Sequence, residues 1–105
     1  MAAYVIAQME VHDAVKYREY ASRVGPTAAA FGGKMLAATD ADVKEGEPAF
    51  RRTIVGEFPS MEDANAWYDS EAYREILPLR LEATTGTLLF VEGFSLPAVD
   101  EGSQG

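Results

Sequence analysis

The order in which two hydrophobic periods alternate along this chain restricts its fold more than any other feature. Residues 4–11 are rich in β-branched and aromatic side chains, which favours a strand. Residues 17–31 then place apolar side chains three, four and seven positions apart, as one face of an amphipathic helix does. The same reading gives strands at 34–39, 51–58 and 87–94 and a helical region from 61 to 86. The sequence thus predicts the order β, α, β, β, α, β.

Short polar side chains mark where the helices are expected to begin. Asp13 is placed to cap the first helix, because its carboxylate can accept the free amide hydrogens of the first turn. Ser60, three residues before Asp63, has capping-box spacing. A break with a fresh N-cap at Asp69 and Ser70 is expected to divide the second helical region.

Proline and glycine mark where the same helices are expected to bend or end. Pro26 lies inside the first apolar stripe and is predicted to kink or divide that helix, because proline has no amide hydrogen. Gly32 and Gly33 are expected to end it. Pro78 is predicted to bend the second helical region, and Gly86 to close it.

This order of elements predicts an α+β fold of the ferredoxin-like βαββαβ type. With right-handed crossovers, four strands form an antiparallel sheet and both helices cover one face. The last strand is apolar on both sides, with Leu88 and Phe90 on one and Leu89 and Val91 on the other. Because the helices cover only one face, we expect a second copy to cover the other, giving a homodimer. Residues 1–95 are predicted to form one domain, and 96–105 a disordered tail.

Composition excludes several kinds of partner and site. The chain has 105 residues and a formal charge of −8, with no basic run, so nucleic acid and anionic membrane surfaces are not expected as partners. It has no cysteine, which removes thiolate nucleophiles, zinc–thiolate sites and iron–sulfur clusters. No charged leader and no apolar stretch of about 18 residues is present, so we expect a soluble, cytoplasmic protein.

Arg80 is the most unusual residue of the second helical region, because its position falls on an apolar stripe. A guanidinium on an inner face needs a partner or water. Either it reaches the rim of the core or pairs with a carboxylate, or it binds an anionic or carbonyl-bearing ligand at the mouth of a cavity. The expected stripe is Tyr73, Ile76, Leu77, Arg80, Leu81 and Thr84, and the candidate carboxylates are Glu10, Glu57 and Glu92.

Two further residues are candidates for acid–base chemistry beside Arg80. His12 is the single histidine, at the end of the first strand, where it is either a loop residue or a general base. Glu57 lies in a strand, where ion pairs with Arg51 or Arg52 compete with a catalytic role. Strand parity does not say which face Glu57 occupies. The candidate catalytic residues are His12, Glu57 and Arg80, with no metal ligand and no cofactor expected.

Aromatic side chains gather on the two helical stripes and at a strand end. Such stripes usually form core, but hydroxyl and indole tips can also line a mostly apolar ligand site. Trp67 and Tyr73 flank the predicted break at Asp69, where a ligand would have room. The expected ligand-binding residues are Tyr17, Tyr20, Trp67, Tyr73 and Arg80.

Several motifs in residues 4–94 resemble the domain-of-unknown-function 1330 family, within the dimeric α+β barrel superfamily. The most specific are EFPS, AWYDS, Tyr73 and ILPLR, which follow one another between residues 57 and 80. The resemblance implies a ferredoxin-like protomer whose sheets pair into a barrel, without an established activity. The wider superfamily includes cofactor-independent oxygenases, isomerases, haem enzymes and ligand-binding proteins. Many of them have a cavity between sheet and helices.

These observations lead to one functional expectation and two alternatives. We expect a dimer that binds a small apolar or aromatic molecule, with a cofactor-independent reaction as an extension of that role. The first alternative is a non-catalytic dimeric scaffold or regulatory protein, with a solid core. The second is haem binding by analogy, which the single histidine at a strand end disfavours.

Overall fold

The computed structural model describes residues 1–94, and the disordered tail expected at 96–105 lies outside this range. The elements follow the predicted order, with the second helical region divided into two helices at Ser70, as expected. In chain order they are β1 (Ala3–Val11), α1 (Ala14–Ala29), β2 (Lys34–Asp40), β3 (Arg52–Phe58), α2 (Met61–Asp69), α3 (Glu71–Ala83) and β4 (Thr84–Glu92).

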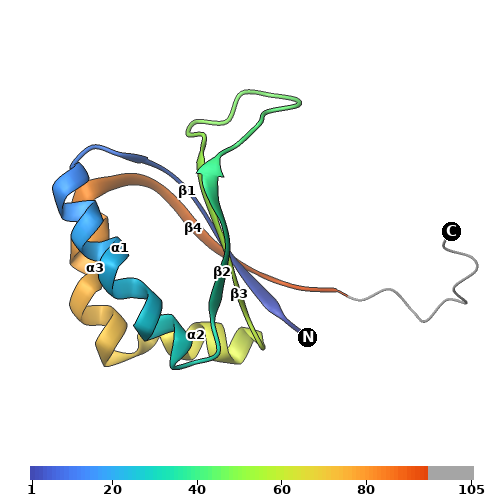
Figure 1. The fold of residues 1–105 in the computed structure, drawn as a ribbon. Coiled ribbons are helices and arrows are strands. Elements are labelled where there is room, and N and C mark those ends of the chain that lie inside the picture. The colour runs from blue at the N-terminus through green and yellow to red at the C-terminus, as the bar shows by residue number, and fades with distance from the viewer. Residues whose placement is uncertain (95–105) are drawn as a thin grey trace, which may run out of the picture.

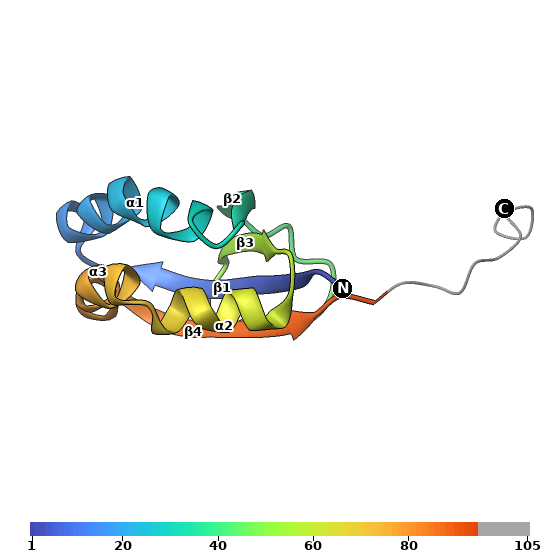
Figure 2. The same cartoon turned by 90° about the horizontal axis from the view of Figure 1, so that it is seen from below.

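The four strands form one antiparallel sheet in the order β2-β3-β1-β4. The helices lie on one face of it, and α1 packs beside α3 in that layer (Figures 1 and 2). This arrangement confirms the predicted ferredoxin-like α+β fold. β1 is a central strand, hydrogen-bonded to β3 on one side and to β4 on the other.

Each helix begins at the predicted capping side chain. The Asp13 carboxylate accepts the Lys16 amide hydrogen at 3.0 Å. The Ser60 hydroxyl accepts the Asp63 amide hydrogen at 3.0 Å. Ser70 follows α2 and caps α3. Within residues 1–94, no helix combines the length and the apolar character needed to cross a membrane.

Pro26 does not divide its helix, and the helix end predicted at Gly86 does not occur. Pro26 lies inside α1, which continues to Ala29 without being divided. Gly86 does not end a helix, because α3 ends at Ala83 and Gly86 pairs with Met9 inside β4. The Thr84 hydroxyl donates to the Arg80 carbonyl at 2.8 Å, which closes the last turn of α3 and lets the strand begin at once.

The core lies between the sheet and the helices. Alternate β1 residues, Ala3, Val5, Ala7 and Met9, are buried on the helix-facing side. On α3 the buried side chains are those of Tyr73, Ile76, Leu77, Arg80 and Ala83. Leu81, expected on this stripe, is 59% exposed, because Ala83 rather than Leu81 continues the three-and-seven spacing from Arg80 and Ile76.

The other face of the sheet carries no helix (Figure 1). Leu88 and Phe90 of β4 pack against the core, as predicted. Their neighbours Leu89 and Val91 point the other way and are 55% and 41% exposed. The two-sided apolar character of this strand is therefore confirmed, and it leaves apolar side chains on the outer face.

Candidate functional site

A cavity of about 170 Å³ lies between the sheet and the helical layer. Its walls are mainly aliphatic side chains from β1 and β3 and the inward face of α1. Aromatic rings of Tyr17, Tyr20, Phe58 and Trp67 also line it, and Arg80 supplies a charge. Four of the five expected ligand-binding residues are thus brought to one space. Small-molecule sites are generally built as an apolar space with a few polar groups.

Arg80 is buried against this cavity, with 8% of its surface exposed. Its Nε donates to the Tyr73 hydroxyl at 3.3 Å, and its Nη groups have no partner in residues 1–94. None of the described carboxylates lies within 4.0 Å of it, so the expected pairing with Glu57, Glu10 or Glu92 is absent from this part of the chain. Burial opposes its charge, but the interaction with Tyr73 leaves the pKa of Arg80 above its ordinary value. The guanidinium is charged.

Tyr73 links Arg80 to Tyr20. The two tyrosine hydroxyl oxygens are 2.9 Å apart. Because the Tyr73 oxygen already accepts from Arg80, its own O–H is the natural donor to Tyr20. The Tyr20 O–H is then free to donate to a group in the cavity. Burial raises the pKa of Tyr20, so it keeps that proton. Tyr73 itself is fully buried and positions the other two residues without lining the cavity.

Trp67 and Tyr17 complete the aromatic part of the wall. The centre of the Trp67 ring lies 4.2 Å from the centre of the Tyr73 ring. The Trp67 indole N–H donates to the Thr27 hydroxyl at 3.0 Å. Tyr17 is half-buried, with its ring 5.8 Å from that of Tyr20. Burial raises the pKa of Tyr17, against an opposing effect of Arg52 and Arg80.

His12 and Glu57, the other two expected catalytic residues, are not brought to the cavity. His12 is exposed in the turn before α1, where its backbone N–H donates to the Ala83 carbonyl at 2.9 Å. Glu57 pairs with Tyr4 across the sheet, which places it on the outer face, 3.5 Å from the Lys34 ammonium. Among residues 1–94, no imidazole or carboxylate lines the cavity. In residues 1–94, no three His, Cys, Asp or Glu side chains gather to form a metal site.

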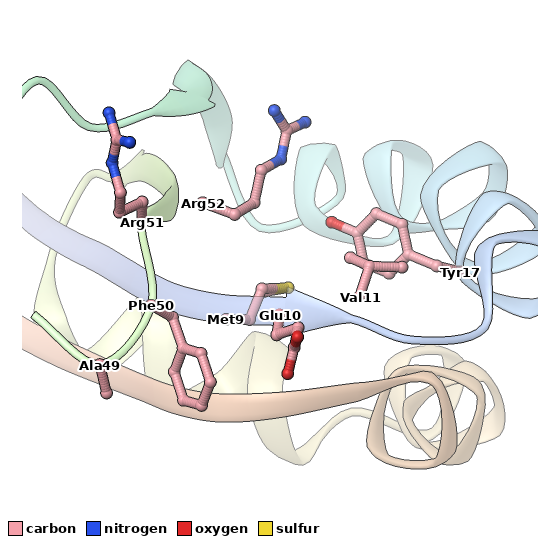
Figure 3. A pocket seen from close by; sticks show the side chains of 8 residues that line it. All are labelled: Met9, Glu10, Val11, Tyr17, Ala49, Phe50, Arg51 and Arg52. Carbon is pink, nitrogen blue, oxygen red and sulfur yellow. The ribbon is translucent and has the colours of Figure 1, made fainter.

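An open groove of about 580 Å³ adjoins the cavity where β1 and the start of β3 meet (Figure 3). Met9 and Tyr17 line both spaces. Arg52 lies in the groove, and the Tyr17 hydroxyl points toward it from α1 (Figure 3). The groove is lined by Met9, Glu10, Val11, Tyr17, Ala49, Phe50, Arg51 and Arg52.

Arg52 is the residue that sequence reasoning missed. The sequence indicates it only as an ion-pair partner, but among residues 1–94 neither Arg51 nor Arg52 forms an ion pair. The sequence does contain an indication of its position. Arg52 and Phe58 are six residues apart in one strand, so their side chains lie on the same face, and Phe58 is a natural core residue. That parity places Arg52 on the face that carries the cavity.

Solved structures with the same fold include proteins of different descriptions. A protein of unknown function from Rhodopseudomonas palustris has 16% sequence identity and a TM-score of 0.73, with 90% of this chain and 84% of that chain covered. SnoaB, a cofactor-independent oxygenase from Streptomyces nogalater, has 8% identity and a TM-score of 0.61, covering 90% and 95%. A putative antibiotic biosynthesis monooxygenase from Nitrosomonas europaea has 10% identity and a TM-score of 0.59, covering 88% and 89%. At these identities the similarity shows the fold alone.

Comparison at the level of sequence identifies the family. No curated protein matches the chain. The model of one family matches residues 2–94, almost all of the part that the structure describes. The resemblance that the EFPS, AWYDS and ILPLR motifs indicated is therefore confirmed. This chain belongs to the family described as domain of unknown function DUF1330.

Proposed function

We propose that this protein binds a small apolar or aromatic molecule, bearing an oxygen acceptor, in the cavity between sheet and helices. The observation that carries the proposal is the state of Arg80. It is charged, buried, and hydrogen-bonded only to one neutral hydroxyl within the described residues. A buried charge without a counter-charge costs several kcal/mol. An acceptor oxygen on a ligand would offset that cost.

The size of the cavity suggests a ligand with about one ring. An engineered apolar cavity of about 150 Å³ in another protein binds benzene. The present cavity, at about 170 Å³, has room for a similar ring, with additional space toward the groove. The Tyr17, Tyr20 and Trp67 rings would contact the apolar body of the ligand, and Arg80 its oxygen.

The same donors would suit a cofactor-independent reaction. The Nη groups of Arg80 and the Tyr20 hydroxyl would stabilise negative charge that develops on a ligand oxygen, as an oxyanion hole does. The description of SnoaB as a cofactor-independent oxygenase gives this extension limited support, because only the fold is shared. We base the proposal on Arg80, Tyr20, Tyr17 and Trp67, with Tyr73 as the positioning residue.

The Arg80→Met variant tests the binding proposal with benzoate as the probe. We expect benzoate to bind the unaltered protein and to bind Arg80→Met about tenfold more weakly, because a charge-assisted hydrogen bond is lost. The melting temperature is expected to stay the same or rise, because the variant removes a buried charge that has no counter-charge among the described residues. Isothermal titration calorimetry and thermal unfolding by circular dichroism measure the two effects.

Arg74→Met is the matched control, since Arg74 lies on the same helix but is exposed and paired with Asp69. Its affinity for benzoate should equal that of the unaltered protein. If benzoate does not bind, or binds Arg80→Met equally well, the proposal is wrong and the non-catalytic scaffold becomes the better account.

We also propose that a second copy of the chain covers the outer face of the sheet. Ile6, Val55, Leu89 and Val91 lie on this face, by their pairing across the strands. Sheets with apolar faces pack against each other in stable assemblies. A two-fold contact between identical faces would bury these side chains.

Leu89→Glu is expected to convert the proposed dimer into a monomer, because it places a carboxylate in a contact between apolar sheet faces. Native mass spectrometry of the purified protein reports the subunit number. Leu81→Glu is the control, because Leu81 is similarly exposed but lies on α3. A monomeric unaltered protein, or equal dimers in both variants, would contradict the proposed contact.

A further inference from the structure

The cavity and the groove adjoin each other. Met9 and Tyr17 line both, so these two side chains form the boundary between them. Tyr17 reaches this boundary from α1, and its hydroxyl points toward the groove (Figure 3). A ligand longer than the cavity would pass Tyr17 to reach the groove.

Arg52 is placed to meet that extension. It pairs with Met9, a residue of the helix-facing side, so its side chain begins on the same side as the cavity. Asp40 of β2 is the cross-strand partner of Arg52, and Glu10 also lines the groove. No carboxylate oxygen in residues 1–94 lies within 4.0 Å of the Arg52 guanidinium. Arg52 is only partly buried and remains accessible.

Tyr17 lines both spaces, and Arg52 and Arg80 both oppose the rise that burial causes in the pKa of its phenol. One is in the groove and the other in the cavity wall. The chain as a whole carries a formal charge of −8, so carboxylates are abundant, yet none in the described residues lies within 4.0 Å of either guanidinium. Two cations, one in each of two adjoining spaces, complement two anionic groups at the two ends of one ligand.

We propose that the ligand is an elongated organic dianion, such as a dicarboxylate with an apolar middle. Arg80 binds the inner anionic group, and Arg52 binds the outer one in the groove. Tyr17, Tyr20 and Trp67 contact the apolar middle. This inference rests on the proposed function and adds the charge and shape of the ligand class.

Terephthalate, which carries a carboxylate at each end of one ring, tests the inference against benzoate, which carries one. Because terephthalate is symmetric, its orientation in the site does not matter. We expect terephthalate to bind the unaltered protein about fivefold more tightly than benzoate, a gain typical of a partly exposed charge pair. Arg52→Met should remove this gain and leave the affinity for benzoate unchanged, which also shows that the site has folded. Isothermal titration calorimetry measures all affinities.

Arg18→Met, an exposed position on α1, loses the same charge and should keep the preference for terephthalate. If benzoate binds in an Arg80-dependent way but terephthalate binds no more tightly, the two-ended ligand is wrong and the proposed function stands. The two-ended ligand is also wrong, and the proposed function stands, if Arg52→Met still binds terephthalate more tightly than benzoate. If neither acid binds the unaltered protein, both the proposed function and this inference fail.

Discussion

The Gly86→Ala variant is expected to lose about 3 kcal/mol of its free energy of unfolding. Gly86 pairs with Met9 where β4 runs along the central strand β1. A Cβ at this position would collide with the Gln8 carbonyl oxygen and lie 2.6 Å from the Met9 Cα, and backbone atoms cannot move away as a side chain can. β4 would have to separate locally from β1. Urea unfolding followed by tryptophan fluorescence measures the loss.

Gly25→Ala is the matched control, because it makes the same substitution inside α1 with nothing beyond the neighbouring residues of the helix within 4 Å of the added Cβ. Its effect on the free energy of unfolding should stay within about 1 kcal/mol, because the gain in helix propensity is opposed by the contact of the new Cβ with Pro26, the next residue. Equal effects of the two variants would show that the close approach at Gly86 is not rigid.

Trp67→Ala is expected to cost about 3–5 kcal/mol, the range for removing a large buried aromatic side chain. The Trp67 ring centre lies 5.2 Å from that of Phe58 and 4.2 Å from that of Tyr73. Its loss would open a void beside the cavity and leave the Thr27 hydroxyl without the indole donor. Thermal unfolding followed by circular dichroism measures the change, because the variant has no tryptophan fluorescence.

Trp67→Phe separates packing from hydrogen bonding, since it keeps one ring and removes the indole N–H. Trp67→Phe should lose less than half as much free energy of unfolding as Trp67→Ala loses. A cost below about 1 kcal/mol for Trp67→Ala would contradict the central position assigned to this ring.

Most of the fold was predictable because local signals and hydrophobic periods agree. The caps at Asp13, Ser60 and Ser70 form as expected, since each depends only on residues up to three positions away. Gly86 was misread because a glycine after a helical stripe usually ends the helix. The actual reason for this glycine is its contact with β1, far away in the sequence.

The site was less predictable, because it depends on the face to which each side chain points. Arg80 was found because a charge on an apolar helical stripe is visible in the sequence. The face that Glu57 occupies was not predictable. Alternation along a strand divides its residues into two faces, without saying which face meets the helices. The register pairs Glu57 with Tyr4 and Arg52 with Met9, and it decides on which face of the sheet Glu57 and Arg52 lie. This register is a property of the assembled sheet.

The central position of β1 has a consequence for how the chain reaches its native state. β1 comes first in the sequence, yet its partners β3 and β4 come later, and Ala3 pairs with Glu92. Such distant pairings close large loops and slow folding. Until β4 arrives, one edge of β1 has open hydrogen-bonding groups beside apolar side chains. During that interval β1 is a template for pairing with other unfinished chains, so the last strand also protects the protein from aggregation.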